Sequence, residues 1–421
     1  MNIRTYYLYR IFNELMPIYP LYMLMFEKGG MSITQMSGLL AIWSVPAVLL
    51  EIPTGVIADH YSRRNMLLLG QILRAAGYLT WIFANGFWLY ALGFILWGIG
   101  GTFRSGSEEA LLYDSLKAEG NERNFDRMLG RGRLFSSIST VLASVVGGYL
   151  GMHYGFLPAL LLSILSALLG AVTVLSMKEV NLYKEHWCKK EKRTKIHTLF
   201  EALSFVLKKK EILLYCLLAL MVLTTAGMLD EYDQLIAKSF GLSITMIGSW
   251  SALRFLLIAC GGYLAPTLHR GLRHAFRHKA PLLQISALCS IAAGALLIAG
   301  LVRSILAMAL YGLYYLIMAA GEVIWEDDIQ QRIEEEGRST VHSVIALCQN
   351  LYGLLCYGLF GGVVASSDLF RGMAWTGIYL FLWIVILCTV YLRWKKGEQS
   401  GAFATSKEQR VNTTEESKYN V

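Results

Sequence analysis

Carboxyl and guanidinium groups lie inside long apolar runs of this 421-residue chain. An ionisable side chain in hydrocarbon costs about 2.5–3.5 kcal/mol on insertion scales, so each such residue is a functional candidate. Burial raises the pKa of a carboxyl group until it exchanges a proton near neutral pH, and a neighbouring arginine opposes that shift. The candidates for this proton-coupling chemistry are Glu14, Glu51, Arg104, Glu108, Asp230, Glu231, Asp233, Arg254, Glu322 and Glu326.

Helical spacing places several of these groups together. Tyr7, Arg10 and Glu14 fall on one face of the first apolar run, so a tyrosine and an arginine are expected beneath Glu14. Arg104 and Glu108 are four residues apart and share a face. Their spacing fits an ion pair within one helix or an element of proton coupling.

Acids outnumber arginines in these runs. Glu322 and Glu326 share a helical face, and Arg254 either neutralises an acid of a neighbouring run or modulates it. Eight acids against two arginines predict an electronegative cavity, which favours cationic or zwitterionic substrates. The aromatic residues expected to face an amphipathic substrate are Tyr7, Trp43, Trp250 and Trp325.

The composition indicates what kind of protein positions these groups. Hydrophobic residues make up 55% of the chain and charged residues 16%, against about 25% charged in soluble domains. Such a chain is too apolar to cover a water-facing surface, which excludes a disordered protein, a secreted disulfide scaffold and an ordinary cytosolic enzyme. The seven cysteines form no CxxC pair, so neither a disulfide framework nor a metal site is expected.

Twelve apolar runs are long enough to cross a membrane, each needing roughly 20 residues. They predict an all-α integral membrane protein with twelve transmembrane helices in two six-helix bundles. The first run is not a cleaved signal peptide, because it holds Arg10 and Glu14 and no small-residue cleavage site follows. The runs are 5–27, 34–58, 65–84, 87–113, 132–152, 156–177, 212–236, 243–268, 281–300, 304–329, 339–365 and 372–394.

The distribution of lysine and arginine predicts the orientation. One set of loops is rich in these residues, and the opposite loops hold only Lys28, Lys238, Arg303 and Arg371. Both termini are therefore expected in the cytoplasm, and the formal net charge of +8 is attributed to the inner loops. The predicted units are a bundle at 1–177, a basic cytoplasmic linker at 178–211, a bundle at 212–395 and a disordered tail at 396–421.

A motif lies between the second and third runs. Gly55, Asp59, Arg63 and Arg64 match the pattern G-x-x-x-D-x-x-x-R-[RK], which resembles the signature of the major facilitator superfamily. Gly55 permits close approach of helices. The fourth run ends at Asp114, and the resemblance implies that this acid pairs with Arg63 and Arg64 in the outward-open state, as a conformational latch.

The resemblance also implies an arrangement of the charges. In this family helices one, four, seven and ten line a central cavity, and most of the charges inside the runs fall on those four helices. The second half carries a degenerate copy of the motif at Gly262, Pro266 and Arg270, without the acid. The chain departs from the antiporter pattern because the glycine-rich run at 145–151 has no proline. The direction of transport is therefore open at this point.

These features predict a secondary transporter of the bacterial drug-efflux-like kind. We expect a proton-coupled efflux antiporter for amphipathic, cationic or zwitterionic small molecules, working by alternating access as a monomer in the cytoplasmic membrane. A proton-coupled importer or a uniporter of a nutrient is the main alternative, and a non-transporting binding protein or a membrane enzyme would be another class. No ATP-binding loop, HExxH or G-x-S-x-G motif is found, so the proton gradient is expected to supply the energy, without metal, cofactor or nucleic acid.

Overall fold

The computed structural model describes most of the chain. It covers residues 3–180 apart from 61 and 106, then 203–276, 280–333 and 338–419. Side chains at 51–60, 338–340, 342–343 and 398–419 are outside the description. The linker predicted at 178–211 therefore lies largely outside the described residues.

The N-terminal half is a bundle of helices that cross the membrane six times. The first crossing is divided between α1 and α2, and the fourth between α5 and α6. The elements are α1 (Ile3–Glu14), α2 (Tyr22–Lys28), α3 (Ile33–His60), α4 (Arg63–Ile82), α5 (Phe87–Arg104), α6 (Ser107–Ala118), η1 (Glu122–Asn124), α7 (Phe125–His153) and α8 (Phe156–Leu175).

The C-terminal half repeats this plan. Its first crossing is one continuous rod that contains a π-helical turn, and its fourth begins with a short 3-10 turn. The elements are α10 (Lys210–Leu218), η2 (Ala219–Leu223), α11 (Thr224–Ser239), α12 (Ile244–Ala275), α13 (Pro281–Val302), η3 (Ile305–Ala307), α14 (Met308–Gln330), α15 (Arg338–Ala365) and α16 (Leu369–Tyr419).

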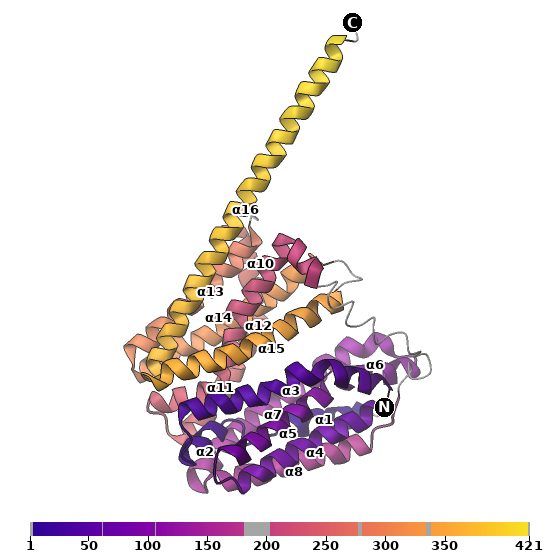
Figure 1. Cartoon of the computed structure of the whole chain (residues 1–421). Helices are drawn as coiled ribbons and strands as arrows, with labels where there is room; N and C mark the ends of the chain where they lie inside the picture. The colour runs from indigo at the N-terminus through magenta and orange to yellow at the C-terminus, as the bar shows by residue number, and fades with distance from the viewer. Residues whose placement is uncertain are drawn as a thin grey trace.

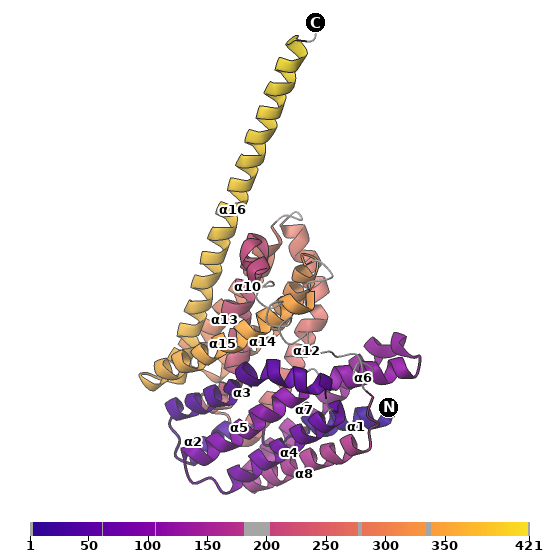
Figure 2. The ribbon, with the colours of Figure 1, turned by 45° about the vertical axis from the view of Figure 1, so that its right-hand side comes forward.

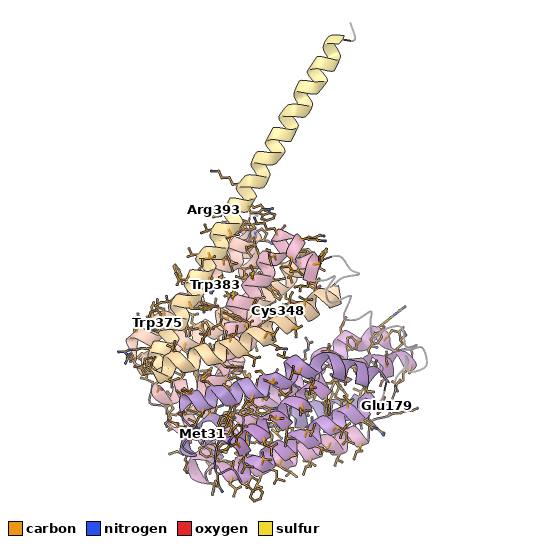
Figure 3. All side chains as sticks on the ribbon, in the orientation of Figure 1. Met31, Glu179, Cys348, Trp375, Trp383 and Arg393 are labelled. Atoms are coloured by element: carbon orange, nitrogen blue, oxygen red, sulfur yellow. The ribbon has the colours of Figure 1, made fainter. Side chains whose placement is uncertain are left out.

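The outer surface of both bundles is apolar. In the described part of the chain, nine helical segments are long and apolar enough to cross a membrane. Leu161 and Leu165 of α8 are exposed, as is Trp375 of α16, and Figure 3 shows Trp375 and Trp383 along α16. Exposed side chains of this kind face hydrocarbon in a membrane protein. The prediction of an all-helical membrane protein built from two bundles is confirmed, and the described elements are consistent with twelve crossings.

The two bundles meet at one end and diverge at the other (Figures 1 and 2). They meet along α3 with α15 and along α7 with α12, and α2 contacts α11. We call this end the closed side; it holds the helix ends around residues 28–33, 153–156 and 239–243. The other end, which carries α6 and the start of the linker, is called the linker side. The molecule is thus open toward the linker side.

Two helix breaks lie inside the N-terminal bundle. Between α1 and α2, Pro17 and Pro20 cannot donate backbone hydrogen bonds, so residues 15–21 form turns. The Ser166 hydroxyl donates to the carbonyl of Phe12 at 2.9 Å, which satisfies a carbonyl at the end of α1. Between α5 and α6, Ser105 adopts an extended backbone with ψ 128°.

The C-terminal tail differs from its prediction. The sequence predicts a disordered tail from residue 396, whereas α16 continues as helix to Tyr419 and projects from the bundle (Figure 1). The tail contains alanine, glutamate, glutamine, lysine and arginine and no proline. These residues have high helix propensity, so a polar composition did not by itself exclude a helix.

Candidate functional site

A cavity of about 280 Å³ lies between the bundles. Most of its wall belongs to the N-terminal half, and Phe255 of α12 reaches it from the other half. A second cavity of about 230 Å³ shares Trp43, Arg74, Trp97 and Arg104 with the first. The first cavity is lined by Asn13, Glu14, Met16, Tyr19, Trp43, Arg74, Tyr78, Trp97, Arg104, Thr140, Ala143, Ser144 and Phe255.

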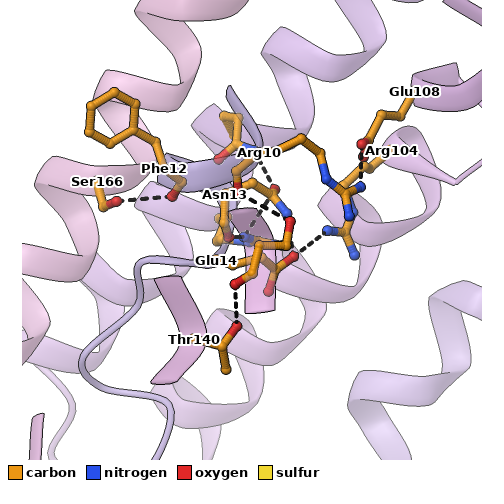
Figure 4. Close-up of polar contacts among 11 residues, drawn as sticks. Arg10, Phe12, Asn13, Glu14, Arg104, Glu108, Thr140 and Ser166 are labelled. Carbon is orange, nitrogen blue, oxygen red and sulfur yellow. Dashed lines mark hydrogen bonds and ion pairs between the residues drawn. The ribbon is translucent and has the colours of Figure 1, made fainter. Parts of the chain in front are cut away.

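Glu14 is the acid on the wall of this cavity. It is the last residue of α1, where the helix breaks, and its carboxylate accepts a hydrogen bond from Arg104 at 3.1 Å (Figure 4). The Asn13 amide donates to the same carboxylate at 2.6 Å. Arg74 of α4 donates to the Asn13 carbonyl at 2.7 Å, so a second guanidinium lies behind the pair.

The expected pairing of Arg104 with Glu108 is wrong. The helix breaks between them, so four residues no longer correspond to one turn. Arg104 pairs with Glu14 instead, and Glu108 pairs with Arg10 of α1. Both ion pairs therefore join the first and fourth crossings (Figure 4).

A second charged cluster lies in the C-terminal half. Arg254 of α12 pairs with Asp230 and, from Nε at 3.3 Å, with Asp233. The indole of Trp250 donates to Asp233 at 2.9 Å and stacks on Tyr311 with ring centroids 5.7 Å apart. Arg254 is only 2% exposed. Burial of these charges is tolerable because each acid has a cationic partner.

One face of α11 joins the two halves at the closed side. The Tyr22 hydroxyl of α2 donates to the Glu231 carboxylate. One turn on, the Gln234 amide donates to the Tyr19 carbonyl at 2.7 Å and accepts from the Met23 amide at 2.9 Å. Gln234 thus satisfies backbone groups exposed by the break before α2. We call the contacts of Glu231, Gln234 and Lys238 with α2 and the turn before it the α2–α11 seam; its third contact is the ion pair of Lys238 with Glu27, at 2.7 Å.

Glu231 differs from the other acids of the interior. Its described partner is the neutral hydroxyl of Tyr22, whereas Glu14, Glu108, Asp230 and Asp233 each pair with an arginine. It is half-buried and its hydrogen bond crosses from one bundle to the other. Among these acids, Glu231 is therefore the one whose charge acts directly on the contact between bundles.

The bundles approach closely at the closed side. A Cβ atom added at Gly148 of α7 would lie 2.8 Å from the Cα of Gly248 in α12, and one added at Gly248 would lie 2.6 Å from the Cα of Gly148. The Tyr232 hydroxyl donates to Ser37 of α3 at 2.7 Å. The crossing of α7 and α12 at the closed side therefore depends on glycines, and Tyr232 adds a hydrogen bond between the bundles.

The linker side of the N-terminal bundle holds the predicted latch. Arg63 pairs with Asp114, and both side chains are buried. Arg64 donates instead to the Met177 carbonyl at 3.3 Å. The side chains of Gly55 and Asp59 lie outside the description. The Arg63–Asp114 pair of the predicted latch is present in this conformation, and its restriction to the outward-open state stays a prediction.

Glu179 was not found by the sequence reasoning. Its carboxylate accepts from the backbone amides of Arg63 at 3.2 Å and Arg64 at 2.9 Å, and from the Ser62 hydroxyl. It therefore caps the N-terminus of α4, where an anion is stabilised by free N–H groups. Nothing in the sequence near the end of the sixth run indicated that the chain would fold back and place this acid at the N-terminus of α4.

The predicted aromatic residues have different surroundings. Trp43 lines both cavities. Trp250 is buried against Asp233, as described above, and Trp325 is buried and donates to the Tyr215 carbonyl at 2.9 Å. The ring of Tyr7 packs against Phe135 with centroids 5.1 Å apart.

The remaining predicted acids are not brought to this cavity among the described residues. Glu322 is exposed on α14, and Glu326 accepts from Gln330 at 2.9 Å on the same helix. The side chain of Glu51 lies outside the description. The predicted excess of eight acids over two arginines is reduced at the described centre, because Glu322 and Glu326 lie elsewhere and Arg74 adds positive charge. Charges at the cavity and the cluster beside it are nearly balanced: the acids are Glu14, Asp230, Glu231 and Asp233 and the arginines are Arg74, Arg104 and Arg254.

Comparisons with known proteins agree with this architecture. A sequence model of the Major Facilitator Superfamily matches residues 6–356. No curated protein sequence matches the chain.

Several solved structures share the fold. The nucleoside transporter NupG is 12% identical with a TM-score of 0.73, over 93% of this chain and 99% of that one. A bacterial homolog of the human lysosomal transporter Spinster, inward-facing and unoccupied, is 16% identical with a TM-score of 0.71, over 93% and 96%. The peptide-transporter-family member PepTSo is 12% identical with a TM-score of 0.70, over 94% and 99%. At these identities the likeness establishes the fold.

Proposed function

This chain belongs to the major facilitator superfamily, and from that premise we propose that it is a proton-coupled secondary transporter of small amphipathic molecules. Alternating access in such folds is a rocking of two bundles around a central site. The cavity described above is the site in this proposal, and the closed side and linker side are the two gates. The membrane is the cytoplasmic one, with both termini on its inner face.

The observation that carries proton coupling is the hydrogen bond between Tyr22 and Glu231. A hydrogen bond to a charged carboxylate is roughly twice as strong as a neutral one. Protonation of Glu231 therefore weakens a contact that holds the closed side together. The two charge states of one acid then favour different conformations, which is the requirement for coupling a proton to alternation.

The surroundings of Glu231 support this role. The groups that interact electrostatically with it are four tyrosine hydroxyls, and two acids of its own helix lie beside it with a buried cation. The cation is already engaged by those two acids. The tyrosines are Tyr19, Tyr22, Tyr232 and Tyr357, and the charged groups of the adjoining cluster are Arg254, Asp230 and Asp233.

The orientation follows from the positive-inside rule. Short loops on the linker side carry more lysine and arginine than the opposite loops, so we place that side in the cytoplasm. The conformation described is then inward-open. We propose proton-coupled efflux as the direction, and the ion pair of Glu14 with Arg104 on the cavity wall suits zwitterionic substrates.

Import is the second candidate, proton-coupled or as a uniporter. Solved structures of similar fold are described as nucleoside and peptide transporters, and the glycine-rich run at 145–151 lacks the proline typical of antiporters. The sign of the pH gradient that drives movement distinguishes the two directions.

The test is transport in proteoliposomes with an imposed pH gradient, using a screen of amphipathic amines and zwitterions. We compare wild type with Glu231→Gln, which keeps the hydrogen bond to Tyr22 but removes the charge change. We expect at least a tenfold loss of gradient-driven accumulation, with exchange at equal pH retained. Glu109→Gln is the matched control, because Glu109 forms an exposed ion pair with Arg133 at 3.3 Å. Gradient-driven transport by Glu231→Gln at the wild-type rate would remove Glu231 from the coupling mechanism.

A further inference from the structure

The cavity wall presents a positive and a negative group side by side. The Glu14 carboxylate and the Arg104 guanidinium are 3.1 Å apart, and their side chains are 33% and 34% exposed. Both line the cavity of about 280 Å³. The Arg10–Glu108 pair of the same two crossings is markedly more buried, with side-chain exposures of 15% and 8%. Of these two ion pairs, Glu14–Arg104 is thus the one that a ligand in the cavity can reach.

The groups behind the pair hold it in place without closing it off. Asn13 donates to Glu14 and accepts from Gln71 at 2.7 Å. Arg74 donates to the carbonyl of Asn13 and is itself buried. A ligand that separates Glu14 from Arg104 therefore meets a fixed carboxylate on one side and a fixed guanidinium on the other, which reduces the cost of ordering the site on binding.

The charge of this wall selects against singly charged ligands. Glu14, Arg74 and Arg104 together carry one net positive charge, so a simple cation at the wall is opposed by two guanidinium groups. A simple anion that pairs with Arg104 leaves Glu14 without its partner. Leaving a desolvated charge unpaired is strongly unfavourable. A ligand with both charges replaces each half of the ion pair.

The rest of the cavity wall is largely aromatic. Trp43, Trp97, Tyr19, Tyr78 and Phe255 line it, and Trp43 and Trp97 lie with ring centroids 5.6 Å apart. Aromatic faces attract an ammonium group and also pack against an apolar side chain. The volume lies just below the usual range of roughly 300–1,000 Å³ for small-molecule sites, so the ligand is small.

We infer that this cavity binds a small zwitterion of the α-amino acid type with an aromatic or apolar side chain. Glu14 receives the ammonium group, Arg104 receives the carboxylate, and the aromatic wall receives the side chain. The inference rests on the proposed transport function, because it names the substrate class of that same site.

Binding is tested on purified full-length protein in detergent, without a membrane or a gradient. The probes are L-phenylalanine, its methyl ester and its N-acetyl derivative, which keep one side chain and present a zwitterion, a cation and an anion. The readout is the rise in melting temperature with probe concentration, which gives the dissociation constant. We expect the zwitterion to bind at least tenfold more tightly than either derivative.

Variants assign the two charges. Glu14→Gln should abolish the preference for L-phenylalanine over its N-acetyl derivative, which lacks the ammonium group. Arg104→Gln should abolish the preference for L-phenylalanine over its methyl ester, which lacks the carboxylate. Glu14→Gln/Arg104→Gln leaves no charge of the pair unpaired and covers the case in which a single variant does not fold. Glu109→Gln and Arg133→Gln, at the exposed ion pair, are the controls.

Three results would overturn the inference. One is a methyl ester or N-acetyl derivative that raises the melting temperature of the wild type as much as L-phenylalanine does. Another is a wild-type protein stabilised by none of L-phenylalanine, L-tyrosine and L-tryptophan. A double variant that retains the wild-type preference is the third. Any of these binding results is compatible with gradient-driven transport by the protein. Conversely, a failure of gradient-driven transport in the Glu231 experiment would not change the binding measured in detergent.

Discussion

Four arginines in the interior each neutralise an acid or satisfy a free carbonyl. Arg10 and Arg104 hold the fourth crossing to the first, and Arg74 contacts the carbonyl of Asn13 at the break of the first crossing. Arg254 serves two acids of α11. Removing either partner of such a pair leaves an uncompensated charge, so these residues determine both stability and access to the cavity.

Trp250→Phe is predicted to destabilise the protein. The change removes the indole N–H that donates to Asp233 at 2.9 Å but keeps an aromatic ring beside Tyr311. Loss of a hydrogen bond to a buried charged group costs about 1–3 kcal/mol. The measurement is thermal unfolding in detergent. Trp375→Phe is the control, since Trp375 is 58% exposed on α16, and equal melting temperatures for the two variants would contradict the role given to Trp250.

Sequence spacing identified the charged residues but not their partners. It placed Arg104 and Glu108 on one helical face because no proline marks the break at Ser105, whereas Pro17 and Pro20 mark the break between α1 and α2. It did not find Glu179, since folding back onto the N-terminus of α4 depends on tertiary structure. The composition of each run was sufficient to predict a crossing, because membrane insertion depends on local hydropathy.

At the scale of the element, the crossing of α7 and α12 controls how closely the bundles meet. Gly148 and Gly248 bring the two backbones together where any side chain would clash. The sequence contains a small-residue pattern at Gly147, Gly151 and Gly155, of which the first two lie in α7, but periodicity could not show that Gly148 would contact a helix of the other half.

Gly248→Ala is predicted to open the closed side. The added Cβ would lie 2.6 Å from the Cα of Gly148, so α7 and α12 must separate. The measurement is the distance between spin labels at Met152 and Met246, two exposed positions near the ends of these helices, and it should lengthen. Gly294→Ala on α13 is the control because its Cβ meets nothing within 4 Å. An unchanged distance in Gly248→Ala would show that this crossing does not set the closure.

At the scale of the whole molecule, the two bundles are joined at the closed side by the α2–α11 seam and by helix crossings. The seam is polar and in part exposed, with Glu27 and Lys238 at its outer end. Exposed contacts such as this ion pair form and separate at modest cost. They are therefore suited to a gate that opens in every transport cycle.

Linking the ends of the seam should stop transport. In a cysteine-free background, Glu27→Cys/Lys238→Cys joined by a short bismaleimide would hold the closed side shut, and we expect turnover to fall at least tenfold. Glu109→Cys/Arg133→Cys is the control, since that ion pair lies within one bundle. Wild-type turnover of the Glu27/Lys238 cross-linked protein in proteoliposomes would exclude opening of this side during the cycle.

The break between α1 and α2 leaves the two parts of the first crossing with different neighbours. α1 packs on α7 and α8 of its own bundle. α2 packs on α4 and α5 of that bundle, where the ring centroid of Phe26 lies 5.0 Å from that of Trp81 and 5.6 Å from that of Phe94, and it also contacts α11 of the other bundle. The intervening residues 15–21 contain two prolines, and from Met16 to Leu21 the backbone forms tight turns in place of helical hydrogen bonds. Glu14 lies at the edge of this break, so a change in its backbone torsion angles would turn the carboxylate that lines the cavity.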